Sequence, residues 1–131
     1  MAHPNKEVVC LYGDGSFGMT AFDMETAQRF GAPYLAIVGN NSAMNQIRYG
    51  QISKYGAQRG GVGNKLGDVD FSLFGKMIGG YGEEVREASQ IQPALLRARE
   101  AIAKTGKCAV VNVWVDPNEY APGTKAQTMY K

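Results

Sequence analysis

The stretch Gly13-Asp14-Gly15-Ser16-Phe17-Gly18 decides the fold of this chain, because the apolar run Val8-Val9-Cys10-Leu11-Tyr12 leads into it and a helical pattern leads out of it. A strand, a glycine turn and a helix start in this order bring backbone N–H groups to one point, which attracts phosphate. The carboxylate of Asp14 repels a phosphate unless a cation lies between the two. The stretch therefore indicates a phosphate held through a metal, although GDG is also an ordinary tight turn.

Length and composition indicate one soluble globular domain. The chain has 131 residues, of which 44% are hydrophobic and 20% are charged, and its net charge is +2. Such a balance argues against a surface dedicated to nucleic acid, and no apolar stretch approaches membrane-spanning length. The N-terminus lacks the apolar segment of a signal peptide, and Cys10 and Cys108 lie in strand-like runs as expected for free buried thiols. We therefore expect a cytoplasmic protein.

The first forty residues read as a βαβ unit. Residues Glu7 to Tyr12 are expected to form a buried strand, and a helix is expected from about Gly18 to Phe30, with Ser16 or Thr20 as its cap. A second strand, Tyr34 to Val38, then ends in Gly39-Asn40-Asn41. Two strands joined in this way should be parallel neighbours in one sheet.

The remaining pattern continues the alternation of helix and strand. Residues 42 to 66 are ambiguous, with a short helix around Met44 to Tyr49 and a glycine-rich loop from Gln58 to Gly67. The later elements are a helix capped by Asp70, a strand at Tyr81 to Val85, a helix that begins at Pro93 and ends at Gly106, and a strand at Cys108 to Val115. The fold class is therefore α/β, with an open parallel sheet and helices on both faces.

Polar side chains follow the first two predicted strands at the points where these strands end. Ligands of open parallel sheets bind beyond the carboxyl ends of the strands, where Asp14 and the pair Asn40-Asn41 are expected to meet. Carboxylate, amide and backbone carbonyl oxygens are hard ligands that suit Mg²⁺ and its bridges to phosphate. The two turns together predict a metal-bridged diphosphate site.

The two turns together form a motif that is similar to one found in a known family. The motif Gly13-Asp14-Gly15, followed by 24 residues and then Asn40-Asn41, resembles the signature of thiamin-diphosphate enzymes. The whole chain is similar to the C-terminal, diphosphate-binding domain of the superfamily that contains acetolactate synthase, pyruvate decarboxylase, 2-hydroxyacyl-CoA lyase and oxalyl-CoA decarboxylase. Residues Asp70 to Gly82 and Val110 to Pro117 match later parts of that domain, and the tail Ala121 to Lys131 looks like that of an acetolactate synthase-like branch.

The resemblance implies the roles of individual residues. The ligands of Mg²⁺ or Ca²⁺ would be the carboxylate of Asp14, the side chain of Asn41 and the backbone carbonyl of Ala43, whereas Asn40 would brace the turn. Residues Asn45 to Tyr49 would lie near the thiazolium ring and the substrate. The residues expected to bind the cofactor are Gly13, Asp14, Gly15, Ser16, Asn41, Ala43, Met44 and Asn45.

The function implied is that of a cofactor-diphosphate-binding subunit or fragment of a thiamin-diphosphate-dependent lyase or carboligase. Its substrate would be a 2-hydroxyacyl-CoA or a 2-oxo acid, and the reaction would cleave or form a carbon–carbon bond next to a carbonyl. An acetolactate synthase-type carboligase or a 2-oxo acid decarboxylase is the alternative within the superfamily. A non-catalytic binding or regulatory module on the same scaffold is the alternative from another class.

The departures from the family imply partners. Family chains have three domains, and the first supplies the glutamate that activates the cofactor's pyrimidine ring, so no catalytic residue is expected in this chain. Residues 1–116 would form a truncated cofactor-binding domain, incomplete at its N-terminal edge, and residues 117–131 an arm or lid. We therefore expect a small subunit or a fragment, inactive without a larger subunit or the missing N-terminal domains, in a homo- or hetero-oligomer.

Overall fold

The computed structural model describes residues 3 and 5–119 and contains a four-stranded, all-parallel sheet with the order β1-β2-β4-β3. Its strands are β1 (Val9–Gly13), β2 (Leu35–Asn40), β3 (Tyr81–Val85) and β4 (Ala109–Trp114). The predicted α/β class, the four strands and the parallel pairing of the first two are confirmed. The order places β1 and β3 at the two outer edges. The expectation of a buried first strand is therefore wrong, because β1 is an edge strand on which Val9 and Leu11 are 50% and 79% exposed.

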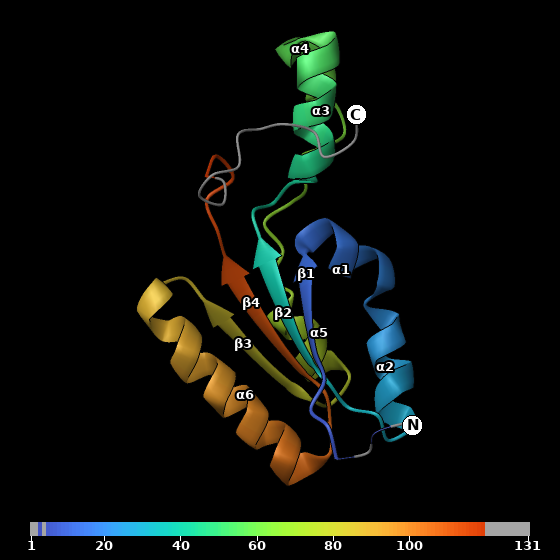
Figure 1. Ribbon diagram of the computed structural model, residues 1–131. Helices are drawn as coiled ribbons and strands as arrows, with labels where there is room; N and C mark the ends of the chain where they lie inside the picture. Colours follow the sequence, from blue (N-terminus) through green and yellow to red (C-terminus); the bar gives the residue numbers. More distant parts are fainter. Residues whose placement is uncertain (1–2, 4, 120–131) are drawn as a thin grey trace.

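Helices cover both faces of the sheet (Figure 1). The helix α6 (Ile91–Thr105), preceded by the short η1 (Ala88–Gln90), packs on one face, while α1 (Asp14–Thr20), α2 (Phe22–Arg29) and α5 (Ser72–Met77) pack on the other. The cluster on the α6 face contains Leu35, Val85, Ala94, Ala98, Ala109, Val111 and Val113. The opposite cluster contains Phe17, Met24, Ala36, Val38, Cys108 and Val110. β4 supplies buried residues to both, as its continuous apolar run indicates.

The first helix differs from the prediction in where it starts. It was expected from about Gly18, but α1 begins at Asp14, inside the motif, and a break at Ala21 separates it from α2. Neither expected cap forms: Ser16 lies within α1, and the hydroxyl of Thr20 donates to the carbonyl of Ser16. Glycine suggested a turn, whereas tertiary packing makes this glycine-containing stretch helical.

Two other boundaries also moved. The expected loop from Gln58 contains a helical turn, α4 (Ala57–Gly60), that packs on α3 (Asn45–Tyr55). A Cβ on Gly60 would lie 2.3 Å from the backbone nitrogen of Ile52, so this glycine permits close packing of two helices. The helix expected from Pro93 starts at Ile91. Both α3 and α4 stand beyond the carboxyl ends of the strands (Figure 1).

Several local expectations are confirmed. Both cysteines are free, as expected, but only Cys108 is buried, because Cys10 lies on the edge strand β1 and is half-buried. Asp70 caps the start of α5, because its Oδ1 accepts from the backbone N–H of Ser72 at 2.9 Å. Within the described part of the chain, no helix has the length and apolar character needed to cross a bilayer. The expected arm over 117–131 lies outside the described residues from position 120 onward.

Candidate functional site

The acid of the motif lies at the carboxyl edge of the sheet, directly after β1. Asp14 is only 3% exposed, and its carboxylate accepts two backbone hydrogen bonds: Oδ1 from the N–H of Gly15 at 2.8 Å and Oδ2 from the N–H of Ala43 at 3.0 Å. Among the ion pairs of the described residues, none involves Asp14. Each carboxylate oxygen keeps a further lone pair, so this buried anion can still bind a cation.

The turn after β2 meets the acid at a single nitrogen atom. The N–H of Ala43 points at Oδ2 of Asp14 and also at Oδ1 of Asn41, which lies 3.2 Å away. Both oxygens therefore lie within 3.2 Å of one atom, although Asp14 and Asn41 are far apart in the sequence. The parallel register, which pairs Gly13 with Gly39, produces this meeting because neighbouring strands end at the same level.

The carbonyl of Ala43 faces the same side as its N–H. Ala43 forms an isolated antiparallel bridge with Lys65, and the bridge bonds join its neighbours instead: Met44 donates to Asn64, and Leu66 donates to Ser42. In this type of pair the residue's own N–H and C=O both point away from the partner strand. The Ala43 carbonyl therefore faces the side on which Asp14 and Asn41 meet.

These three groups fit a magnesium or calcium ion by the chemistry of their donors. A carboxylate, an amide oxygen and a backbone carbonyl are all hard oxygen ligands. A carboxylate as buried as that of Asp14 also gains from a cation, because burial without a counter-charge is costly. The structure thus brings the expected ligand set together, while its binding of an ion stays a prediction.

The glycine turn itself is shaped by the loop beyond it. A Cβ on Gly15 would lie 3.1 Å from Cγ of Met44, so the side chain of Met44 packs directly over this glycine. Gly13, in contrast, has no atom within 4 Å of such a Cβ, and Ser16 is exposed. The expected cofactor-binding residues Gly13, Gly15 and Ser16 therefore adjoin the acid in the chain, Met44 packs on Gly15, and open space lies beside Gly13.

Asn45 takes a different direction from the rest of the set. It begins α3, and its Nδ2 donates to the carbonyl of Pro117 at 2.7 Å, a carbonyl to which the hydroxyl of Tyr49 also donates at 2.8 Å. The two donors tie α3 to the segment that follows β4. The polar contact seen for Asn45 is thus with this segment and not with Asp14 or Asn41.

A small cavity lies on the far side of the turn. It has a volume of about 310 Å³ and is lined by Asn41, Ser42, Asp68, Arg86, Trp114, Val115 and Pro117. Its wall is held together by polar contacts: the hydroxyl of Ser42 donates to Asp68 at 2.6 Å, and the indole N–H of Trp114 donates to Glu84 at 2.6 Å. The amide of Asn41 therefore stands between this cavity and Asp14.

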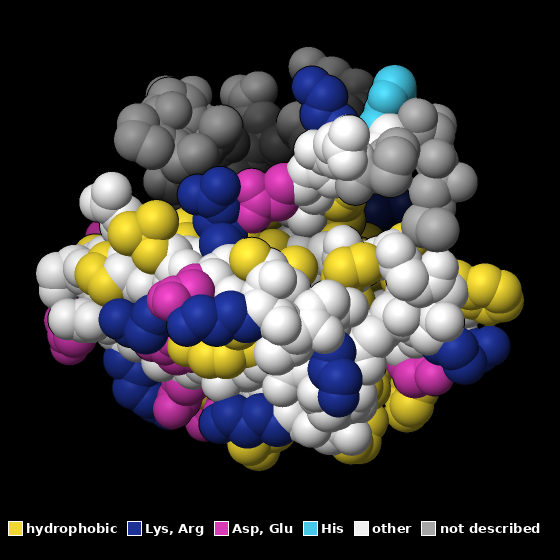
Figure 2. Space-filling model, turned by 90° about the horizontal axis from the view of Figure 1, so that it is seen from below, with side chains coloured by type: hydrophobic (Ala, Val, Ile, Leu, Met, Phe, Trp, Pro, Cys, Tyr) yellow, Lys and Arg dark blue, Asp and Glu magenta, His cyan; other side chains and the backbone are white. Residues whose placement is uncertain are grey.

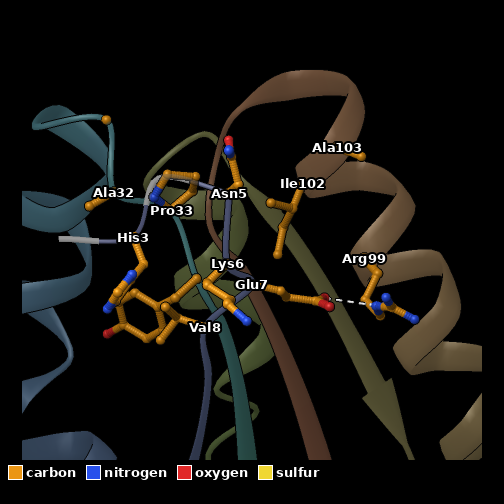
Figure 3. Close-up of a pocket in the computed structure, with 12 residues that line it drawn as sticks. His3, Asn5, Lys6, Glu7, Val8, Ala32, Pro33, Arg99, Ile102 and Ala103 are labelled. Carbon is orange, nitrogen blue, oxygen red and sulfur yellow. Dashed lines mark hydrogen bonds and ion pairs between the residues drawn. The ribbon is translucent and has the colours of Figure 1, made fainter. Parts of the chain in front are cut away.

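The opposite end of the sheet carries a larger groove, of about 850 Å³. It lies between the segment before β1, the loop before β2 and the end of α6, and an ion pair of 2.7 Å between Glu7 and Arg99 crosses it (Figure 3). On this end of the molecule, basic and acidic side chains are interspersed with hydrophobic ones (Figure 2). The groove is at the amino ends of the strands, so it is separate from the site around Asp14.

Sequence reasoning missed one residue of this region, Asn112. It lies in the middle of β4, is fully buried, and its Oδ1 accepts from Nδ2 of Asn40 at 3.0 Å. The signal was present in the sequence, since Asn112 is the one polar residue in the run Cys108 to Val115. A polar side chain inside an otherwise apolar strand needs a buried partner.

Comparisons with known proteins identify the family of this chain. Residues 1–113 match the family described as "Thiamine pyrophosphate enzyme, C-terminal TPP binding domain". The chain is 30% identical over 122 residues to a probable acetolactate synthase of Mycobacterium bovis, covering 93% of this chain and 21% of that protein. It is 27% identical over 125 residues to 2-hydroxyacyl-CoA lyase 2 of Mus musculus, covering 95% and 19%, respectively. The chain thus spans about a fifth of the length of these relatives.

Proposed function

Because this chain belongs to the thiamine pyrophosphate enzymes, as their C-terminal TPP-binding domain, we propose that it holds the diphosphate of the cofactor through a Mg²⁺ or Ca²⁺ ion. One observation carries the proposal: Oδ2 of Asp14 and Oδ1 of Asn41 converge on the N–H of Ala43 in a buried position. These two oxygens are held close together beside a glycine turn, and each keeps a lone pair with which it can bind a cation that bridges to phosphate.

Different residues of the chain would bind the metal ion and the diphosphate. Asp14, Asn41 and the carbonyl of Ala43 would hold the ion, while Gly13, Gly15 and Ser16 would face the diphosphate. Thiamin diphosphate, when bound, supplies the capacity to stabilise negative charge on a substrate carbon. The protein's own part is to fix the cofactor's position through backbone and side-chain groups that are already hydrogen-bonded in place.

The relatives support a proposal for the class of reaction. We propose that the whole enzyme is a lyase or carboligase that breaks or makes a carbon–carbon bond next to a carbonyl. The substrate proposed first is a 2-hydroxyacyl-CoA or a 2-oxo acid, because relatives include both a 2-hydroxyacyl-CoA lyase and an acetolactate synthase at similar identity. An acetolactate synthase-type carboligase or a 2-oxo acid decarboxylase is the alternative hypothesis for the whole enzyme. A non-catalytic module is disfavoured by the intact set of oxygen ligands.

Further polypeptide is part of the proposal. The chain corresponds to about a fifth of its relatives, and Val9 and Leu11 of the edge strand β1 are 50% and 79% exposed. A parallel sheet is normally covered on both faces. We propose that other domains of the same enzyme, on this or another chain, cover β1 and supply the activating glutamate, so that the 131-residue chain alone does not turn over substrate.

A calorimetric titration tests the cofactor site directly. Thiamin diphosphate is added to the 131-residue chain with Mg²⁺, with Ca²⁺ and with EDTA, and the same series is run on Asp14→Ala. Binding is expected only with a metal, and the variant should bind at least about 100-fold more weakly, as befits loss of a direct ligand.

Asp23→Ala is the matched control. Asp23 is exposed and lies in the first turn of α2, so removing its carboxylate should leave binding unchanged. Metal-independent binding to the wild-type chain, or equal affinity of Asp14→Ala and Asp23→Ala, would contradict the proposed site. Turnover by the isolated chain would contradict the need for other domains.

A further inference from the structure

Asn112 occupies a buried position in the inner strand β4 of the sheet. Asn112 lies in β4 on the face that packs on α5, between Val110 and Trp114 of the same face, and its side chain is fully buried. Its strand partners are Val38 of β2 and Glu84 of β3. A buried amide costs free energy that a valine at this place would not, so the amide must do something that an apolar side chain cannot.

The orientation of the neighbouring amide is determined by its partners. Oδ1 of Asn40 accepts from the backbone N–H of Ser42 at 3.1 Å, and Nδ2 of Asn40 donates to the carbonyl of Val69 at 2.7 Å. A backbone N–H can only donate and a carbonyl can only accept, so the amide of Asn40 cannot be flipped. Its second N–H then points to Asn112.

The orientation of Asn112 follows by the same reasoning. Because Asn40 presents an N–H, Asn112 must present its oxygen, which accepts at 3.0 Å. The amide nitrogen of Asn112 is left buried, with no partner among the described residues. Asn112 thus accepts one hydrogen bond through Oδ1 while its Nδ2 makes none. The position therefore requires the acceptor, Oδ1, and not the donor.

Asn40 passes this constraint to the metal-binding turn, which we define as residues 40–43. Ser42 has a φ of 53°, in the left-handed region that non-glycine residues rarely adopt, and the bond from its N–H to Asn40 helps to hold it there. The next N–H, that of Ala43, is the one on which Asp14 and Asn41 meet. Three bonds fix the amide of Asn40, and that amide fixes the turn.

We infer that Asn112 is a positioning residue for the metal-binding turn. It acts through Asn40 and not on the ion: by accepting from Asn40, it locks the amide that sets the backbone of Ser42 and so aims the Ala43 N–H and carbonyl. This role rests on the proposed function, because only that function places a metal at the turn. The three hydrogen bonds that hold the amide of Asn40, which we call the lock, are present in the structure without any ligand.

Hydrogen exchange measures the lock without any ligand. Backbone exchange of Ser42 and Ala43 is followed by NMR relative to the amide of Ala109, which donates to Tyr34 at the other end of β4 and reports opening of the sheet. In Asn112→Leu, which removes the acceptor at similar volume, the relative exchange of Ser42 and Ala43 should rise about tenfold, as loss of one hydrogen bond supports.

Two further variants separate positioning from general destabilisation. Val111→Ala leaves a cavity on the opposite face of β4, where Val111 is fully buried, and should not change the relative exchange of Ser42 and Ala43. Asn112→Asp keeps an oxygen where Asn40 needs an acceptor, so relative exchange should return to within about twofold of the wild type even if the protein is less stable overall.

The Mg²⁺ concentration that half-saturates cofactor binding is the second readout. It should rise about tenfold in Asn112→Leu and remain unchanged in Val111→Ala, in line with residues that orient metal ligands. Equal relative exchange in Asn112→Leu and Val111→Ala would overturn the lock, and an unchanged Mg²⁺ requirement would overturn the positioning role. Failure of the wild-type chain to bind the cofactor would instead refute the proposed function, while the exchange result still decides the lock.

Discussion

The two edges of the sheet are built in opposite ways. β3 presents charged side chains: Glu83 pairs with Arg97 of α6 at 2.5 Å and bonds to the hydroxyl of Tyr81, while Glu84 pairs with Arg86 at 2.5 Å. β1 presents Val9 and Leu11, which are 50% and 79% exposed, and no charged residue lies between them. Charges on an edge discourage further strand pairing, whereas a bare apolar edge invites it.

The difference extends to the packing behind each edge. A Cβ on Gly82 of β3 would lie 1.9 Å from the carbonyl oxygen of Ser72, and one on Gly75 of α5 would lie 2.2 Å from that of Tyr81. Strand and helix therefore touch backbone to backbone. Gly13, at the end of β1, meets nothing within 4 Å. The β3 edge is therefore closely packed against α5, whereas the end of β1 is not covered by other described residues.

The candidate site adjoins β1, the edge with exposed apolar side chains. Asp14 follows β1 directly, and the open space beside Gly13 is where the diphosphate is proposed to lie. This chain would supply one half of the proposed site. The position of the bare edge agrees with the proposal that other domains complete the second half.

The largest effect should come from filling the close contact behind β3. Gly82→Ala places a methyl group against the backbone of Ser72, which cannot move aside as a flexible side chain can, so we expect a loss of about 3 kcal/mol or more in the free energy of unfolding. Gly13→Ala should change it by no more than about 0.5 kcal/mol. Urea unfolding followed by circular dichroism measures both, and equal losses would mean that the two edges do not differ in packing.

A charge on β1 should change association. The isolated chain is expected to self-associate through its bare apolar edge, and Leu11→Lys should shift it to the monomer, because a lysine on an edge strand opposes pairing. Met77→Lys on α5 is the matched control, since Met77 is also exposed, at 62%, and α5 packs on β3 and β4. Sedimentation velocity over a range of concentrations decides between them. Identical behaviour of the two variants would remove β1 as the interface.

A smaller effect is expected at the β3 edge in acid. The hydrogen bond from Arg97 holds the pKa of Glu83 below its ordinary value of 4.5. A lowered carboxyl pKa contributes stability that is present above pH 4.5 and is lost as the pH falls through the pKa of the folded state. Glu83→Gln should therefore reduce the folding equilibrium constant at pH 7 by at most about fivefold. The difference from the wild type should disappear in acid, and a difference that persists there would contradict this assignment.

The smallest effect is expected next to β1 in alkali. Burial, and then the hydrogen bond with Tyr12 at 3.4 Å, raise the pKa of the Tyr34 hydroxyl above its ordinary value of 10.0. This stability is present below pH 10 and is lost as the pH rises through the higher pKa of the folded state. Tyr34→Phe should therefore lose stability less steeply above pH 10. Some slope should remain, because burial also raises the pKa of Tyr81. Thermal unfolding between pH 9 and 11 provides the comparison.

Much of the site was predictable from the sequence because it depends on local order. A strand, a glycine turn and a second strand that ends in Asn40-Asn41 are sufficient to bring Asp14 and Asn41 to one edge, since neighbouring parallel strands end together. The start of α1 at Asp14 was not predictable in this way. Glycine favours turns locally, and only packing of Met44 and Phe17 around the turn makes the helical conformation the better one.

The sequence by itself determined the α/β class, the parallel pairing of the first two strands and the meeting of Asp14 with Asn40-Asn41 at one edge, because periodicity and turn residues act over short distances. The choice of Asp14, Asn41 and Ala43 as ligands was implied by the resemblance to thiamin-diphosphate enzymes. Only the tertiary structure decided which strands became edges and which buried amide would lock the turn. Asn40 and Asn112 are 72 positions apart, and the hydrogen bond between them depends on β2 and β4 lying side by side. A hydrogen bond between residues so far apart produces no periodic pattern in the sequence, so it can be identified only once the pairing of the strands is known.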